Sequence, residues 1–190
     1  MDHEQELAPS EEAVPRKARI CTCWLDGCSG CHMSLLDLDE GIVAVLRKAD
    51  IVFGPLVDAQ EWPEGVDVAV IEGAVSSQDD LRLVQTARAR SKVVVALGDC
   101  AVTGNVPSLR NGIPVRKLLE RVYVEGATAT PGVPTDGVPG LLKQAEPLRS
   151  SITVDVPVPG CPPKPNAILL VLSELLEGRT PDLGSKLRFG

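Results

Sequence analysis

The chain has 190 residues, 44% of them hydrophobic and 24% charged, which suits one globular domain with its own hydrophobic core. Its formal net charge of −7 at pH 7 and its aromatic content of 3% argue against a basic surface that stacks on bases, so we expect no nucleic-acid partner. No stretch reaches the ~18 consecutive apolar residues of a membrane-spanning helix, so we also expect no membrane span.

The N-terminal segment MDHEQELAPSEEAVPRKA is polar and acidic, with neither the apolar core of a secretory signal nor paired arginines. We therefore expect a cytoplasmic protein with a flexible tail over residues 1–17, one domain over 18–180 and a C-terminal tail over 181–190. In a reducing compartment, the six cysteines are more often ligands, catalytic thiols or buried small residues than disulfides. Because the chain has only two histidines, any metal would be held mainly by sulfur.

The first half of the chain alternates between strand-like and helix-like segments. Residues 18–25 (ARICTCWL) predict a strand, and apolar residues at near-helical spacing over 32–49 predict the first helix, although Gly41 weakens its centre. A short strand over 50–57 is ended by Gly54-Pro55. The continuous apolar run over 67–75 predicts a strand that is buried on both faces.

The second half continues this alternation. The expected elements are a serine-capped helix, a buried strand, a helix, a strand shortened by prolines and a closing helix, over 76–91, 92–100, 114–124, 151–161 and 162–178. This order predicts an α/β fold, a flavodoxin-like doubly wound parallel sheet with helices on both faces. The Gly/Pro/Thr-rich segment 126–140 is interpreted either as a long surface loop or as a clamp on a partner subunit.

Four cysteines follow the predicted strands. Cys28 and Cys31 come after the first strand, Cys100 leaves the strand over 92–100, and Cys161 comes after the last strand. Because the strand-to-helix turns of a parallel sheet lie at its carboxyl edge, we expect these thiols to converge there. They suit Zn²⁺ or an iron–sulfur cluster, and one CxxC pair joined by two distant cysteines favours the cluster. Their Gly- and Pro-containing turns argue against four unrelated core residues.

Residues next to these cysteines fit such a centre. Gly27 and Gly30 would let the backbone approach a cluster closely and aim N–H groups at its sulfurs, and Gly160 would also allow close approach. Pro162 lies where we expect the last helix to begin, a position at which proline costs little. The positive ends of the helices after Cys31 and Cys161 would favour thiolates.

Four further residues are open to two interpretations each. Cys21 and Cys23 share one face of a strand, where they are two small core residues unless Cys23 is a spare or redox-variable ligand. Glu72 is either a capping group or a neighbour or occasional ligand of the cluster. His32 either bonds a cluster sulfur or, as we favour, faces a partner.

The motifs together resemble a known family. Cys28-x-x-Cys31, EGAV at 72–75, GDCAVTGN at 98–105 and PGCPP at 159–163 are similar to the small, electron-transfer subunit of a soluble NAD-reducing [NiFe] hydrogenase, over residues 18–178. The resemblance implies that Cys28, Cys31, Cys100 and Cys161 hold one [4Fe-4S] cluster. Many family members have Glu directly before the first ligand, where this chain has Gly27, so a proton path through that carboxylate is not implied.

The resemblance also implies a function. The chain would relay electrons from H₂ oxidation in a [NiFe] large subunit to diaphorase subunits that carry flavin and iron–sulfur clusters and reduce NAD⁺ (hydrogen dehydrogenase, EC 1.12.1.2). We expect no catalytic residue in this chain, since no nucleophile set or phosphate loop is present. The alternatives are an FMN-binding flavodoxin-like carrier, the 20-kDa-type subunit of an NADH:quinone oxidoreductase, and a zinc-stabilised adaptor. FMN is not favoured, because the cysteine turn occupies the place of a phosphate loop, and CSGC lacks the adjacent cysteines usual in the 20-kDa subunit.

Overall fold

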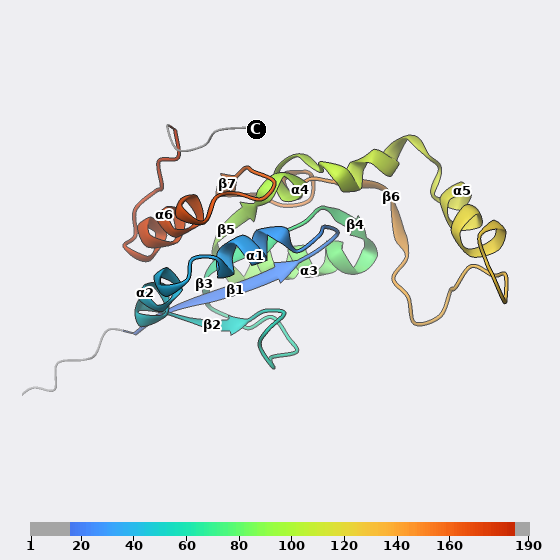
Figure 1. Ribbon diagram of the computed structural model, residues 1–190. Coiled ribbons are helices and arrows are strands. Elements are labelled where there is room, and N and C mark those ends of the chain that lie inside the picture. Colours follow the sequence, from blue (N-terminus) through green and yellow to red (C-terminus); the bar gives the residue numbers. More distant parts are fainter. Residues whose placement is uncertain (1–15, 185–190) are drawn as a thin grey trace, which may run out of the picture.

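The computed structural model describes residues 16–184 (Figure 1). Within this range, a five-stranded parallel sheet has the order β2-β1-β3-β5-β7. Its strands in chain order are β1 Ala18–Trp24, β2 Ala49–Phe53, β3 Val66–Glu72, β5 Ser91–Leu97 and β7 Val156–Val158. This is the flavodoxin-like strand order, which reverses direction between β1 and β3. The predicted fold class is confirmed.

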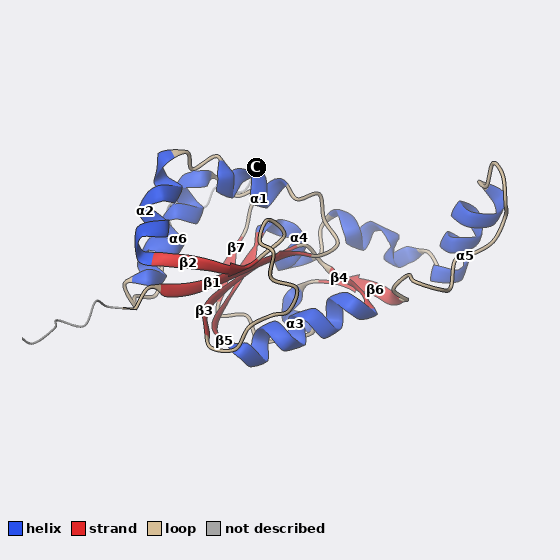
Figure 2. Cartoon of the chain, turned by 90° about the horizontal axis from the view of Figure 1, so that it is seen from below, coloured by secondary structure: helices blue, strands red, loops and turns tan. Residues whose placement is uncertain are grey.

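Helices cover both faces of the sheet (Figure 2). One face is covered by α1 Gly30–Leu36, α2 Glu40–Lys48 and α6 Pro165–Leu176, and the other by α3 Gln78–Arg90. Alternate residues of β3 face opposite sides of the sheet. Val68 and Val70 belong to the core beneath α1, α2 and α6, whereas Ala69 and Ile71 belong to the core beneath α3. A strand buried on both faces therefore has one continuous apolar run, as the sequence predicts.

The helix predicted over 76–91 is confirmed, and its start has a clear cause. Ser77 accepts a hydrogen bond from the Asp80 N–H, and the Asp80 side chain accepts one from the Ser77 N–H, which completes a capping box. The helix predicted over 32–49 is wrong as a single element. It breaks at Asp39, whose φ of 49° lies outside the helical region, so α1 and α2 are separate helices.

Three other predicted boundaries need correction. The strand over 67–75 ends at Glu72, because Gly73 has a φ of 92° and an added Cβ would come 2.9 Å from the Leu25 carbonyl carbon. Val75 instead begins β4 Val75–Ser77, which pairs antiparallel with the unpredicted β6 Leu141–Glu146. The last helix begins at Pro165, so proline does occupy its first position, but Pro162 precedes it.

Short helical segments connect β5 to β6. They are α4 Gly98–Thr103, the 3₁₀ segment η1 Val106–Gly112, α5 Val115–Glu120 and the π-helical turn η2 Arg121–Glu125, followed later by the 3₁₀ turn η3 Leu148–Ser150. The helix predicted over 114–124 is thus present as α5 and η2. Residues 113–140 form an arm that projects from the body in both views and contains no buried residue (Figures 1 and 2). Segment 126–140 has neither helix nor strand.

Residues 1–15 and 185–190 of the expected tails lie outside the described residues. Leu183, which falls in the expected C-terminal tail, is 9% exposed and joins the core under α6. No helix in residues 16–184 is both long and apolar enough to cross a membrane.

Candidate functional site

The structure places the four candidate cysteines after the carboxyl ends of three parallel strands. Cys28 lies in the loop after β1, Cys31 in the first turn of α1, Cys100 in α4 after β5, and Cys161 after β7. Cys31 is buried, Cys100 is half-buried, and Cys28 and Cys161 are exposed. Cys100 is therefore a helix residue, because β5 ends at Leu97. The order of strands reverses next to this edge, which is where open α/β sheets bind ligands.

Backbone contacts hold these segments against one another. Asp99 N–H donates to the Gly160 carbonyl over 2.9 Å, and Gly160 N–H donates to Asp99 Oδ1 over 2.7 Å. These two bonds place Cys100 and Cys161 on adjoining segments although 61 residues separate them in the chain. Gly98, at the start of α4, lies directly against the Cys31 side chain.

The other cysteines help to raise the pKa values of two of the four thiols, Cys31 and Cys100. The pKa of Cys31 is raised, first by burial and then by the negative charges of Glu72 and of the other three cysteines. The pKa of Cys100 is raised in the same way by burial and by Cys161 and Cys28, with a hydrogen bond from Val106 N–H opposing the shift. Deprotonating such thiols requires a compensating positive charge, as a bound metal centre supplies.

A single ion and a polynuclear centre place different demands on these donors. In residues 16–184, no three His, Cys, Asp or Glu side chains surround one point as closely as a single ion requires. A structural Zn²⁺ needs four donors about 2.0–2.3 Å from one point, whereas the four cysteines of a cubane cluster bind four different irons. Four thiols from separate loops at one edge are the sulfur donors that either a Zn²⁺ ion or an iron–sulfur cluster would use.

Glu72 and His32 form a buried pair beneath the CxxC loop. The Glu72 carboxylate, 2% exposed, accepts hydrogen bonds from the backbone N–H groups of His32 (2.9 Å) and Cys31 (3.4 Å) and lies 2.5 Å from His32 Nδ1. Burial raises the pKa of Glu72, but these bonds outweigh it and hold the pKa below its ordinary value. Glu72 is thus a capping group, although it caps α1 rather than the turn that follows its own strand.

Two expectations about this region need correction. His32 is 6% exposed and packs edge-on against Trp24 with ring centroids 5.3 Å apart. Its ring is therefore not exposed on the surface of this chain, where a partner subunit could contact it. The N–H groups of Cys31 and His32 point at Glu72, so they are not free to donate to cluster sulfurs. Gly27 is close to backbone instead: its added Cβ would come 3.4 Å from Gly73 Cα.

The other flanking residues differ in what they contact. An added Cβ on Gly30 would come 3.2 Å from Cys28 Sγ, and one on Gly160, whose φ is 138°, would come 2.6 Å from Pro163 Cα. The peptide bond before Pro162 is cis. Sequence reasoning missed Asn105, whose Nδ2 donates to Cys161 Sγ over 3.6 Å. Its place in GDCAVTGN, after a cysteine-bearing turn, was the available signal.

Cys21 and Cys23 belong to the other side of the sheet. Both are buried in the core that β1 shares with α3, whereas Cys31 lies in the core beneath α6. Burial raises the pKa of Cys21 to about 12 and also raises the pKa of Cys23, which is further raised by Cys21 and Asp80. This position fits the core interpretation and places Cys23 in a different core cluster from Cys31.

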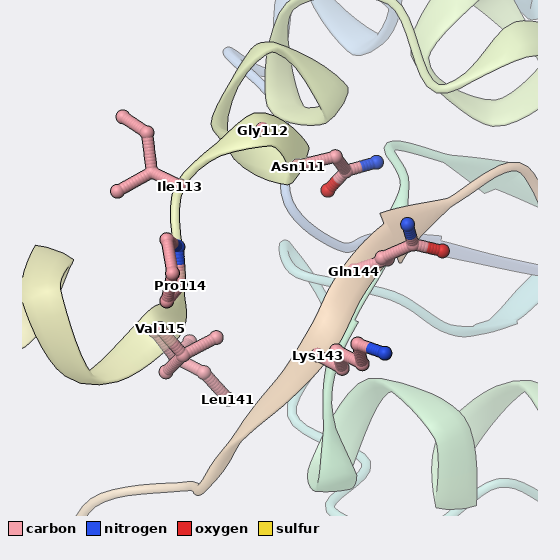
Figure 3. A pocket seen from close by; sticks show the side chains of 8 residues that line it. All are labelled: Asn111, Gly112, Ile113, Pro114, Val115, Leu141, Lys143 and Gln144. Atoms are coloured by element: carbon pink, nitrogen blue, oxygen red, sulfur yellow. The ribbon is translucent and has the colours of Figure 1, made fainter.

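A separate hollow lies at the base of the arm (Figure 3). This cavity of about 380 Å³ is bounded by residues 111–115 on one side and by Leu141, Lys143 and Gln144 of β6 on the other. None of its lining residues is a cysteine, an acid or a histidine, so it is distinct from the cysteine edge.

The fold and the cysteines at the carboxyl edge of the sheet together define a class of protein. It comprises α/β subunits that carry their functional groups where the strand order of a flavodoxin-like sheet reverses. The family described as "NADH ubiquinone oxidoreductase, 20 Kd subunit" matches residues 28–175. The chain belongs to this family.

The relatives found by comparison are hydrogenase subunits. The chain is 32% identical to the delta subunit of the NAD-reducing hydrogenase HoxS of Cupriavidus necator, over 97% of this chain and 93% of that one. It is 40% identical to a subunit of the vhu F420-non-reducing hydrogenase of Methanocaldococcus jannaschii, over 86% of this chain but only 57% of the relative. The chain thus spans little more than half the length of that relative.

Solved structures agree with this assignment. A chain of an NAD⁺-reducing [NiFe]-hydrogenase in its H₂-reduced state superposes with a TM-score of 0.87 at 36% identity, covering 92% of this chain and 100% of the other. A [NiFeSe]-hydrogenase chain from Dm. baculatum superposes with a TM-score of 0.57 at 20% identity, which shows the shared fold alone. The predicted resemblance to a hydrogenase small subunit is confirmed.

Proposed function

We propose that this chain is the electron-relay subunit of a cytoplasmic NAD-reducing [NiFe] hydrogenase, with Cys28, Cys31, Cys100 and Cys161 holding one [4Fe-4S] cluster. The observation that carries the proposal is that these four cysteines follow three strands at one edge of the sheet, where the other cysteines help to raise the pKa values of Cys31 and Cys100. The cluster supplies one-electron transfer, and the chain supplies no bond-making site.

The chain's own residues support such a relay in three ways. The Asp99–Gly160 bonds hold two ligand segments together, and Glu72 orients the start of the helix that carries Cys31. Asn105 donates to Cys161 Sγ, an interaction of the kind that raises a cluster's reduction potential. Burial of Cys31 would keep water away from the inner side of the cluster. Cys28 and Cys161 are exposed, so a partner would cover the cluster on their side.

The partners follow from the same proposal. A [NiFe] large subunit would deliver electrons from H₂, and diaphorase subunits with flavin and iron–sulfur clusters would accept them for NAD⁺ reduction. The relative from Cupriavidus necator, which matches this chain almost end to end, supports NAD⁺ as the final acceptor. The exposed segment 126–140 stays open to both interpretations made from the sequence, a surface loop or a clamp on such a partner.

Anaerobic purification of the complex tests the function. We expect roughly four irons and four sulfides assigned to this chain and an EPR signal on reduction. Cys100→Ser and Cys161→Ser should abolish H₂-dependent NAD⁺ reduction, while Cys21→Ser, a matched change in the opposite core, should keep most of it. Zinc without iron would overturn the proposal, and a yellow, acid-released flavin bound to this chain would favour the FMN alternative.

A second candidate is a relay in a hydrogenase with an acceptor other than NAD⁺. The 40% identity to a subunit of an F420-non-reducing hydrogenase, whose name specifies no NAD⁺ acceptor, motivates this candidate. The two candidates share the cluster and differ in the acceptor. Complex that takes up H₂ and reduces an artificial dye but not NAD⁺ would support the second candidate against the first.

A further inference from the structure

Glu72 makes its contacts across the fold rather than within its own turn. It is the last residue of β3, yet within residues 16–184 the donors that reach its carboxylate belong to α1: the N–H of His32 at 2.9 Å, the N–H of Cys31 at 3.4 Å and His32 Nδ1 at 2.5 Å. One carboxylate from the centre of the sheet therefore holds the first turn of the helix that carries Cys31.

The start of α1 has no acceptor of its own. Ser29 precedes the helix with a φ of 63° and makes no side-chain cap hydrogen bond, and the first turn contains no acidic residue. The first N–H groups of a helix have no partner within it, so a buried start needs an acceptor from elsewhere. Glu72 provides that acceptor from 41 residues further along the chain.

The same carboxylate orients the His32 ring. A carboxylate is an acceptor only, so the hydrogen between Nδ1 and Glu72 Oε2 belongs to the ring. The other ring nitrogen, Nε2, is buried and has no hydrogen-bond partner among the described residues. Trp24, packed edge-on at 5.3 Å, limits rotation of the ring from its other side.

We propose that Glu72 is a positioning residue that sets the Cys31 turn and the Nδ1–H form of His32 in the chain before a cluster is bound. The inference deepens the proposed function. Its prediction about cluster retention rests on that function, whereas its prediction about the His32 ring does not. A loop that already presents Cys31 loses less conformational freedom when the cluster binds, so removal of the carboxylate should weaken cluster retention.

The first test needs no cluster. In the iron-free full chain with ¹⁵N-labelled histidine, we expect the His32 ring to carry its hydrogen on Nδ1, with a His32→Gln variant assigning the signal. Glu72→Ala should remove this preference, whereas Glu125→Ala, the same change in the exposed η2 turn, should keep it. A wild-type His32 that carries its hydrogen on Nε2 alone would overturn the proposal.

The second test measures iron in the anaerobically purified complex. We expect Glu72→Ala to lower cluster affinity about 10- to 100-fold, as loss of a ligand-orienting partner does elsewhere. Glu72→Gln keeps one acceptor oxygen in a side chain of the same size, so its cluster affinity should lie between those of Glu72→Ala and wild type. This variant keeps the test valid if Glu72→Ala fails to fold. Wild-type iron in a folded Glu72→Ala complex would overturn the proposal. Iron-free wild-type complex would instead overturn the cluster function, while the histidine signal still decides the Glu72 contact.

Discussion

Gly98 lies so close to Cys31 that a Cβ atom added to Gly98 would come 2.2 Å from Cys31 Sγ. Gly98 also has a φ of 83°, a conformation that costs other residues roughly 1–2 kcal/mol. The absence of a side chain at Gly98 therefore makes room for a candidate ligand from another loop.

We predict that Gly98→Ala displaces Cys31 and removes most of the iron from the purified complex, with a lower Tm. Gly112→Ala is the matched control, because an added Cβ there meets no atom within 4 Å. Iron content and thermal denaturation of both variants, measured side by side, check the prediction. Equal iron in Gly98→Ala and Gly112→Ala would contradict the tight contact.

The sequence predicted the parallel sheet because its buried strands are continuous apolar runs, and this same topology brings distant cysteines to one edge. It did not predict β6, whose residues Leu141–Glu146 (LLKQAE) lack β-branched side chains. That strand depends on tertiary partners: Ala145 exchanges two hydrogen bonds with the Asn111 side chain, which substitutes for a neighbouring strand.

Contacts at the site were harder to predict than positions. The positions of the cysteines in the sequence place each thiol after a strand. The hydrogen bonds from α1 to the Glu72 side chain in β3 depend on side-chain directions that no local sequence pattern encodes. His32 follows a candidate ligand and resembles a surface residue in the sequence, yet the Glu72 contact and Trp24 enclose it. The break at Asp39 was hidden because apolar residues continue across it at helical spacing.

We predict that Asn105 raises the reduction potential of the cluster by donating to Cys161 Sγ. Asn105→Gly removes the donor and suits a backbone φ of 29°. Loss of one hydrogen bond worth about 0.5–1.5 kcal/mol should lower the potential by roughly 20–60 mV. Asn105→Asp should lower it further, because it adds a negative charge. An EPR-monitored redox titration measures both, and an unchanged or higher potential in Asn105→Gly would argue against this role.

The capping box of α3 offers a prediction about stability alone. Ser77→Ala removes the acceptor of the Asp80 N–H, so we expect a loss of about 1 kcal/mol in the free energy of unfolding. Ser77→Asp replaces the hydroxyl with another good capping acceptor and should recover part of the loss. Urea unfolding gives both values. A fully stable Ser77→Ala variant would indicate that Asp80, which also accepts from the Ser76 N–H, holds this turn by itself.

Asp67 joins three parts of the molecule and predicts a pH dependence. Its carboxylate accepts from Arg16, from the Arg19 N–H (2.8 Å) in β1 and from Lys92 (2.9 Å) in β5. Burial alone would raise the pKa of Asp67, but the bonds from Lys92, Arg19 and Arg16 outweigh it and lower the pKa from its ordinary 3.8. The folded state therefore binds this proton more weakly than the unfolded state does.

A group whose pKa is lowered on folding adds stability above its unfolded pKa and loses it as the pH falls through its folded pKa. We expect Asp67→Asn to cost about 1–2 kcal/mol at pH 7, because charge-assisted hydrogen bonds are lost. The difference from wild type should begin to shrink below about pH 4, where Asp67 becomes protonated in the unfolded chain, and should shrink further as the pH falls through the lower native pKa. Unfolding free energies measured from pH 3 to pH 7 check this, with the exposed Asp136→Asn as control. A difference that stays constant across that range would show that Asp67 acts through its shape rather than its charge.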